Sequence, residues 1–256
     1  MSRSHSSAKM RLLVVNPNTT ASMTAKIAAA ARDAGSAGTE IVAVNPRSGP
    51  AAIEGYVDGA LAVPGLLAEI GAGEAKAVDG HIIACFDDTG LDAARALARA
   101  PVIGIGEAAY HVASLVAGRF SVVTTLSRSV PIIEENLVRF GLAARCARVR
   151  ASEVAVLDLE EPGTAARERV AAEIAEAIRH DRADAIVLGC AGMADLAASF
   201  AARFGLPVIE GVAAAVKLAE AVVGLRLATS KTGAWAAPVQ RANAARFAVE
   251  SGADLS

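Results

Sequence analysis

Short apolar runs alternate along the chain with longer segments in which apolar residues recur every three or four positions. The short runs predict strands, at residues 11–16, 40–46, 80–86, 101–106, 120–125, 147–154, 184–190 and 207–211. The longer segments predict helices, at residues 24–35, 63–73, 90–100, 107–118, 130–141, 164–181, 194–205 and 212–225. Apolar strands that alternate strictly with helices are typical of parallel sheets covered on both faces. We therefore predict an α/β fold.

The local pattern of the chain recurs after 105 residues. Asp79 lies six residues before Cys85, and Asp184 lies six residues before Cys190. A leucine follows each cysteine after six more positions, and the tripeptide Pro-Val-Ile then appears after each leucine. This repetition indicates a duplicated α/β unit.

The duplication predicts two similar lobes related by a pseudo-two-fold axis. The expected boundaries are residues 10–106 with 212–238 for the first lobe, 107–211 for the second lobe, and 1–9 for a disordered leader. Ligands of open parallel sheets bind beyond the carboxyl ends of the strands. Because Cys85 and Cys190 both follow such ends, we expect them on opposite walls of one cleft between the lobes.

Composition and charge narrow the range of partners. The formal net charge of −2 gives no reason to expect nucleic acid or an anionic membrane as a partner. No apolar run is long enough for a membrane span, and the first residues lack the apolar core of a signal peptide. Three cysteines without the spacing of a secreted scaffold predict reduced thiols and a cytoplasmic protein. The alanine-rich helices favour subunit contacts, so we expect a homo-oligomer.

Two thiols at matching positions of a repeat fit acid–base chemistry at a carbon atom. To invert a stereocentre, one base removes the proton from one face and a second acid delivers a proton to the other face. The ordinary pKa of a thiol, about 8.5, is close to neutral pH. We expect a helix N-terminus after each cysteine to stabilise the thiolate. Asn and Thr side chains and backbone N–H groups can hold the enolate oxygen that forms.

Other roles for the cysteines stay open at this point. Free cysteines often fill core space, and this is the role we expect for Cys146. A disulfide between Cys85 and Cys190 would need an oxidising compartment. A zinc site would need further ligands at close spacing, and the four histidines do not provide them. A nucleophilic cysteine would need a histidine partner that the sequence alone cannot place.

Four segments resemble the aspartate/glutamate racemase superfamily, and specifically its hydantoin racemase branch. They are VVNPNTT at 14–20, ACFDDTGLDAAR at 84–95, VVTTLSRS at 122–129 and VLGCAGM at 187–193. The resemblance extends from about Met10 to about residue 238. It implies a racemase that needs neither a metal ion nor an organic cofactor. It also implies two α/β lobes with one catalytic cysteine in each.

The resemblance makes Cys85 and Cys190 the two acid–base residues. The motifs, and positions at the predicted cleft, mark the residues expected to bind substrate: Asn16, Ser48, Gly49, Pro50, Phe86, Asp87, Thr124, Thr125, Ala191, Gly192 and Glu210. For Glu210, at the end of a predicted strand, capping of the following helix is an equally good interpretation.

Two departures from family motifs bear on the substrate. The related allantoin racemases tend to carry Gly-Asp-Pro-Gly after the Cys-Phe pair, whereas this chain has Asp-Asp-Thr-Gly at 87–90. The superfamily's amino-acid racemases usually follow the second cysteine with Thr-His, whereas this chain has Ala-Gly at 191–192. We therefore expect racemisation of 5-monosubstituted hydantoins by proton transfer at C5. Allantoin is the alternative substrate.

Four further interpretations carry less weight. The Asp-Thr-Gly triplet at 88–90 occurs in aspartic proteases, but their fold is all-β and needs the triplet twice. Gly104 and Gly106 could open a dinucleotide-binding turn, but the next predicted strand ends in threonine where an acidic residue is needed. A two-lobed binding protein without catalysis would need a cleft but no matched thiols. Decarboxylases of the superfamily use one cleft cysteine, and this chain has two.

Overall fold

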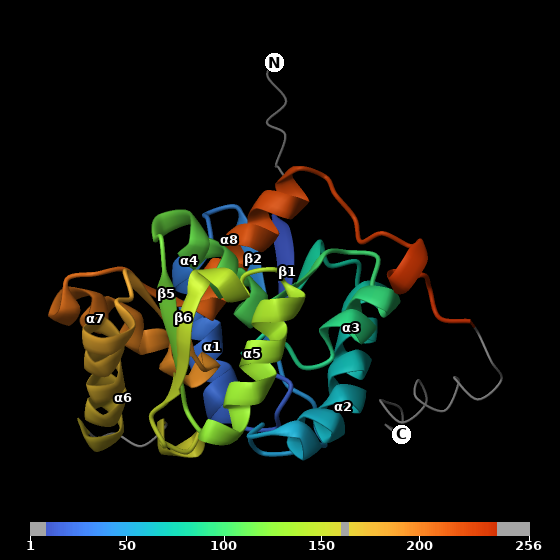
Figure 1. Cartoon of the computed structure of the whole chain (residues 1–256). Helices are drawn as coiled ribbons and strands as arrows, with labels where there is room; N and C mark the ends of the chain where they lie inside the picture. Colours follow the sequence, from blue (N-terminus) through green and yellow to red (C-terminus); the bar gives the residue numbers. More distant parts are fainter. Residues whose placement is uncertain (1–8, 160–163, 240–256) are drawn as a thin grey trace.

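Strands and helices alternate along the chain as the apolar pattern predicts (Figure 1). The computed structural model describes residues 9–159 and 164–239. The predicted leader, residues 1–9, lies outside this range except for Lys9.

Within the described residues, parallel strands form two four-stranded sheets. The strands are β1 (Met10–Val15), β2 (Thr39–Val44), β3 (Gly80–Ile83), β4 (Val102–Gly104), β5 (Phe120–Thr124), β6 (Cys146–Ala151), β7 (Ala185–Gly189) and β8 (Val208–Glu210). The first sheet has the order β2-β1-β3-β4 and the second has the order β6-β5-β7-β8. Adding four to each strand number in the first order gives the second order, so the two sheets share one topology. The predicted α/β fold with two similar parallel sheets is confirmed.

Helices cover both sheets. They are α1 (Ala21–Ala34), α2 (Tyr56–Ala75), α3 (Leu91–Leu97), α4 (Ile105–Val116), α5 (Val130–Arg139), α6 (Thr164–Glu176), α7 (Ala197–Phe204) and α8 (Gly211–Gly224). Short 3-10 turns occur as well, among them η1 (Ser127–Ser129), η3 (Leu157–Leu159) and η5 (Ala191–Leu196). Apolar side chains fill the space between helices and sheets, and the largest buried cluster contains residues of both lobes, such as Leu12, Tyr110 and Val187.

The last helix of each half of the chain packs against the other half. Helix α4 follows β4 of the first sheet but packs against β7 and β8 of the second sheet. Helix α8 follows β8 of the second sheet but packs against β3 and β4 of the first sheet. The two helices also pack against each other, between the sheets. The lobe boundaries at 106/107 and 211/212 stay a prediction.

The strand ends set the start of the loops that carry the two matched cysteines. Strand β3 ends at Ile83, earlier than predicted, so Cys85 stands two residues beyond the sheet. The Ala84 N–H still donates to the Val15 carbonyl at 2.8 Å, and this bond holds the departing chain. Strand β7 ends at Gly189, directly before Cys190. Both cysteines therefore occupy loops at the carboxyl ends of central strands.

The close crossing of α4 and α8 is the basis of a stability prediction. A Cβ on Gly211 would lie 2.6 Å from the carbonyl oxygen of Ile105, a backbone atom that cannot yield without moving α4. We predict that Gly211→Ala lowers the free energy of unfolding by roughly 1–3 kcal/mol. Gly224→Ala, at the other end of α8, meets no atom within 4 Å. It should change that free energy by less than about 0.5 kcal/mol. Urea unfolding of both variants checks this, and equal stabilities would contradict it.

Candidate active site

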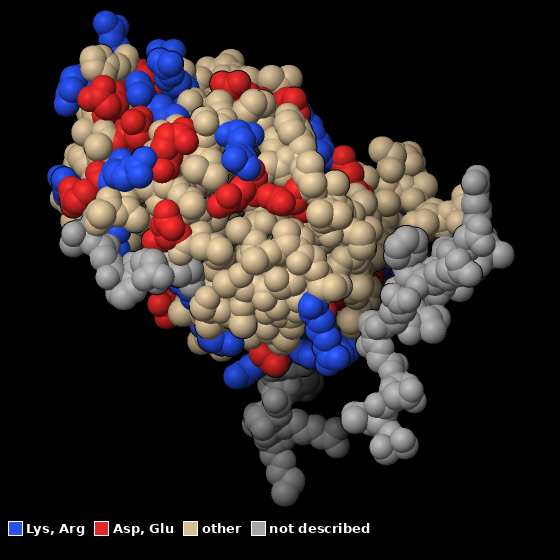
Figure 2. All heavy atoms as spheres, turned by 90° about the horizontal axis from the view of Figure 1, so that it is seen from below, with Lys and Arg blue, Asp and Glu red and all other residues tan. Residues whose placement is uncertain are grey.

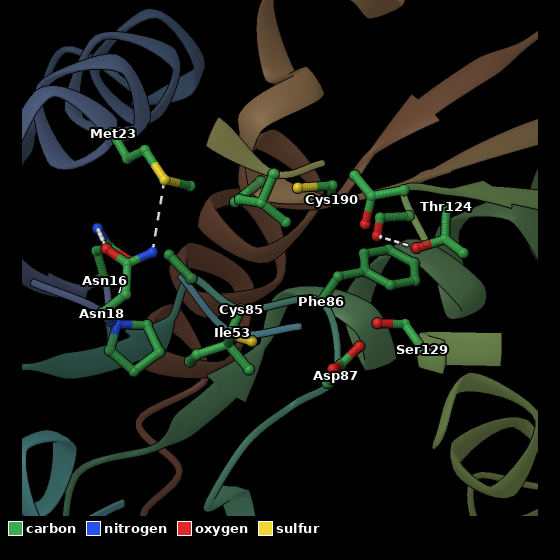
Figure 3. A pocket seen from close by; sticks show the side chains of 16 residues that line it. Asn16, Asn18, Met23, Ile53, Cys85, Phe86, Asp87, Thr124, Ser129 and Cys190 are labelled. Atoms are coloured by element: carbon green, nitrogen blue, oxygen red, sulfur yellow. Dashed lines mark hydrogen bonds between the residues drawn. The ribbon is translucent and has the colours of Figure 1, made fainter. Parts of the chain in front are cut away.

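A cavity opens at the carboxyl ends of the central strands, between the two lobes (Figure 3). Its volume is about 400 Å³ when the solvent at its open mouth is included. Its lining comes from the loops after β1, β2, β3, β5, β6 and β7, the last residues of β5 and β7, and the start of α1. The lining residues are Asn16, Pro17, Asn18, Met23, Ile53, Ala84, Cys85, Phe86, Asp87, Thr124, Thr125, Ser129, Val156, Gly189, Cys190 and Ala191. Both halves of the chain thus contribute to one cavity.

Most of the residues expected at the cleft line this cavity. They are Cys85, Cys190, Asn16, Phe86, Asp87, Thr124, Thr125 and Ala191. The lining also contains polar side chains that the sequence analysis missed, Asn18 and Ser129. Both lie inside the motifs quoted above, in the turns that follow β1 and β5, and these motifs are the signal that could have found them. Ile53 and Val156 lie outside the quoted motifs, and no comparable signal marks them.

Five expected residues lie outside the cavity lining: Ser48, Gly49, Pro50, Gly192 and Glu210. The loop 48–50 packs on the turn after β1, where the Pro50 carbonyl accepts the Thr19 N–H at 3.0 Å. The Gly192 N–H points at the Cys190 sulfur, 3.4 Å away. The Glu210 carboxylate accepts the N–H groups of Val212 at 2.7 Å and Ala213 at 2.5 Å. Of its two interpretations, the helix cap is the one that the geometry supports.

Two of the three thiols face the cavity, one from each lobe (Figure 3). The Cys85 sulfur lies 3.4 Å from the Thr89 hydroxyl. Cys190 is the N-cap of η5, and its sulfur accepts the Gly192 N–H. Cys146 starts β6 instead, and its thiol donates to the Arg148 carbonyl at 3.5 Å. The cavity therefore brings together the two cysteines of the sequence repeat and leaves the third outside.

Burial controls the protonation of these thiols. It raises the pKa of Cys190 to about 12, although the Gly192 N–H acts in the opposite direction. It also raises the pKa of Cys85 far above its ordinary value, and the negative charge of Asp87 adds to this effect. The backbone N–H groups of Asp87 and Gly192, which follow the two cysteines, lower the thiol pKa values as expected, but burial outweighs them. Helix α3 begins only at Leu91, and burial outweighs the N–H group at η5. Both thiols are protonated at neutral pH.

Some polar side chains of the lining already donate hydrogen bonds to other groups of the protein. The Asn16 amide nitrogen donates to the Asn18 side-chain oxygen at 2.8 Å and to the Thr24 hydroxyl at 3.0 Å. The Thr124 hydroxyl donates to the Gly189 carbonyl at 2.9 Å. These groups shape the walls of the cavity rather than offering a free donor.

Other polar groups are left for a ligand. The Asn18 amide nitrogen contacts the Met23 sulfur at 3.5 Å, and a thioether is a weak acceptor. The hydroxyls of Thr125 and Ser129 form no side-chain hydrogen bond with the described part of the chain. These three neutral donors are suited to carbonyl or enolate oxygens.

A contact between the lobes closes one side of the cavity. The Val156 N–H, in the loop after β6, donates to the Glu54 carboxylate at 2.9 Å, in the loop between β2 and α2. Ile53 and Val156 line the cavity next to this bond. Two apolar side chains held in this way reduce the access of water to the thiols.

Three observations concern binding to charged partners, metal ions and membranes. On the face seen from below, Lys and Arg side chains intermingle with Asp and Glu around a broad uncharged area (Figure 2). Among the described residues, no three His, Cys, Asp or Glu side chains are grouped so that they could hold a metal ion. In the same part of the chain, no helix has the length and apolar character needed to cross a bilayer.

Comparison with known proteins identifies the family. The Asp/Glu/Hydantoin racemase family matches residues 12–219. The chain belongs to this family. This racemase is 51% identical over 229 residues to a hydantoin racemase of Rhizobium meliloti, covering 90% of this chain and 95% of that protein. It is 44% identical to a hydantoin racemase of Pseudomonas sp. (strain NS671), covering 91% of this chain and 93% of that protein.

Solved structures agree with this assignment. The racemase aligns with allantoin racemase from Klebsiella pneumoniae at a TM-score of 0.90 and 50% identity, covering 91% and 96% of the two chains. An aspartate racemase of Picrophilus torridus shares the fold, with a TM-score of 0.61 and 13% identity over 84% and 94% of the chains. The resemblance inferred from the sequence motifs is confirmed. The protein is an isomerase, and a binding protein without catalysis is no longer a viable alternative.

The lining carboxylate Asp87 is the basis of a pH prediction. Burial raises its pKa to about 7. A carboxyl whose pKa is raised on folding stabilises the protein below its unfolded pKa, and this stability is lost as pH rises through about 7. Asp87→Asn avoids that loss, so we predict a larger gain in Tm over the native protein at pH 8.5 than at pH 5. Asp33→Asn, exposed on α1, is the matched control. The same Tm difference at both pH values would show that Asp87 does not titrate.

Proposed function

We propose that this racemase acts on 5-monosubstituted hydantoins, with Cys85 and Cys190 as its two acid–base residues. The observation that carries the proposal is the pair of thiols, one from each lobe, that line one cavity. The neutral donors of Asn18, Thr125 and Ser129 complete the polar part of that lining.

The charge of the lining favours a hydantoin over a free amino acid. No Lys or Arg is among the described residues that line the cavity, and the nearby Lys26 amine is paired with Asp195 at 3.0 Å, so no free cation faces an α-carboxylate there. A hydantoin ring is uncharged and presents carbonyl oxygens, which neutral donors can bind. Its C5 proton is also more acidic than the α-proton of an amino acid carboxylate. Less electrostatic assistance is then needed to remove it.

The proposed reaction is a proton transfer through an enolate. One cysteine, in its thiolate form, takes the proton from C5, and the electron pair of the C–H bond moves into the C4 carbonyl. The other cysteine, in its thiol form, then delivers its proton to the opposite face of C5. The enolate returns to the carbonyl, and the two cysteines have exchanged protonation states. The Thr89 hydroxyl and the Gly192 N–H are the groups that stabilise the two thiolates.

Allantoin is the second candidate substrate, because it is itself a hydantoin with a ureido group at C5. The allantoin racemase from Klebsiella pneumoniae, at 50% identity, supports it. The hydantoin racemase of Rhizobium meliloti, at 51% identity, supports the broader class. A cytoplasmic location and a homo-oligomeric state stay predictions.

Replacement of single cysteines tests the two-base mechanism. We predict that Cys85→Ser and Cys190→Ser each slow racemisation at least roughly 100-fold, because each removes one of the two proton carriers. Cys146→Ser, outside the cavity, should stay near the native rate. Optical rotation and the C5 proton signal are followed together in D₂O, with chelator, on single enantiomers of 5-benzylhydantoin and allantoin.

Each active-site variant should still exchange the C5 proton of one enantiomer without inverting it. If either variant racemises at a near-native rate, the two-base mechanism is wrong. If the native protein racemises neither compound faster than the protein-free control, the proposed function is wrong.

A further inference from the structure

We propose that Asp87 makes this racemase prefer hydantoins whose C5 substituent carries a cation, such as an ammonium group, over hydantoins with an apolar substituent. The inference rests on the proposed function, because it takes C5 of the substrate to lie between Cys85 and Cys190.

The Asp87 carboxylate is free to bind a ligand. It points into the cavity beside Ser129 and Phe86 (Figure 3). The backbone of the residue is fixed, because the Asn136 amide donates to the Asp87 carbonyl at 2.9 Å. Neither carboxylate oxygen accepts a hydrogen bond from the described part of the chain. Asp87 is therefore held in place while its charged group has no partner.

The neighbouring carboxylate, Asp88, has a structural role in the same turn. The Asp88 carboxylate accepts the Gly106 N–H at 3.0 Å and the Glu107 N–H at 2.7 Å. Both of its oxygens are satisfied at the start of α4. Asp87 has no equivalent partners, so helix capping does not explain its presence.

Among the described residues that line the cavity, Asp87 supplies the only charged side chain apart from the ionisable thiols. A half-buried carboxylate without a protein partner is costly, because it has lost part of its water and gained no hydrogen bond in exchange. A cation on the ligand would offset that cost with a charge-assisted hydrogen bond, which is stronger than a neutral one. The sign of the one lining charge therefore favours a positive substituent.

When C5 lies between the two thiols, only some of the groups attached to it can face Asp87. The Asp87 carboxylate lines the same cavity as both thiols (Figure 3), and its charge raises the pKa of both. The proton of C5 lies along the line between the thiols. The C4 oxygen becomes negative in the reaction and is repelled by a carboxylate. Of the groups attached to C5, the ring N1–H and the substituent remain. Every hydantoin has the N1–H, so only the substituent can create a preference.

A pair of substrates with the same shape tests the proposal. The compounds are 5-(3-aminopropyl)hydantoin and 5-butylhydantoin, which differ by an ammonium group in place of a terminal methyl. We measure kcat/KM for both at pH 8.5, where Asp87 is ionised, with the native protein, Asp87→Asn and the control Asp33→Asn. The ratio of the two values cancels any effect of the variant on thiol ionisation, because both substrates meet the same free enzyme.

We expect the native protein and Asp33→Asn to prefer the aminopropyl compound. Asp87→Asn should lower the ratio about tenfold or more, because it removes the charge-assisted hydrogen bond that only the ammonium substrate forms, whatever it does to kcat/KM for both substrates. An unchanged ratio overturns the proposal. An equal fall for both substrates also overturns it, because Asp87 would then act on the ring or on the thiols. Asp87→Ser serves as a second variant if the asparagine variant does not fold.

Activity on 5-butylhydantoin separates this proposal from the proposed function. A native protein that racemises it without preference for the ammonium compound is a hydantoin racemase in which Asp87 does not select. A native protein that racemises neither compound contradicts the proposed function, and the role of Asp87 falls with it.

Discussion

The two helices that cross between the lobes each begin on a carboxylate that accepts their first N–H groups, and the site depends on this constraint. Asp88 caps α4 and Glu210 caps α8. Gly104 and Glu210 end the equivalent strands β4 and β8. At Gly104 a Cβ would lie 2.1 Å from an Asp88 oxygen, so the absent side chain leaves the space that Asp88 fills. Helix α8 is therefore capped by the last residue of the strand before it, whereas helix α4 is capped from the loop that carries Cys85.

This difference breaks the symmetry of the two thiols. The Cys85 loop is tied through Asp88 to the start of α4, and Asp88 accepts a left-handed backbone conformation, with φ of 50°, to reach it. Such a conformation is uncommon for a residue with a side chain and persists where its contacts hold it. Cys190 instead caps a 3-10 turn directly, and its sulfur receives a backbone N–H. A duplicated fold thus presents two thiols in chemically different surroundings to one cavity.

The sequence predicted the architecture because apolar strands and amphipathic helices leave a regular pattern, and it found the paired cysteines because the duplication repeats them. It placed the start of α2 too late, since Pro64 is typical of a helix start but lies here inside a helix that begins at Tyr56. It favoured Asn16 over Asn18, although only hydrogen-bond geometry shows which amide is occupied. The raised thiol pKa values also could not be foreseen, because burial depends on both lobes together.

The electrostatics of the cavity support the proposal of a neutral and relatively acidic substrate. With both thiols protonated in the free protein, formation of a thiolate is a cost that the reaction must meet. Asp87 increases that cost, since a negative charge close to both sulfurs opposes a second one. A substrate that brought its own carboxylate would add a third negative charge with no lining cation to offset it. An uncharged ring avoids this penalty, and a cation bound at Asp87 would lower it. The same carboxylate then connects the choice of substrate to the ionisation of the bases.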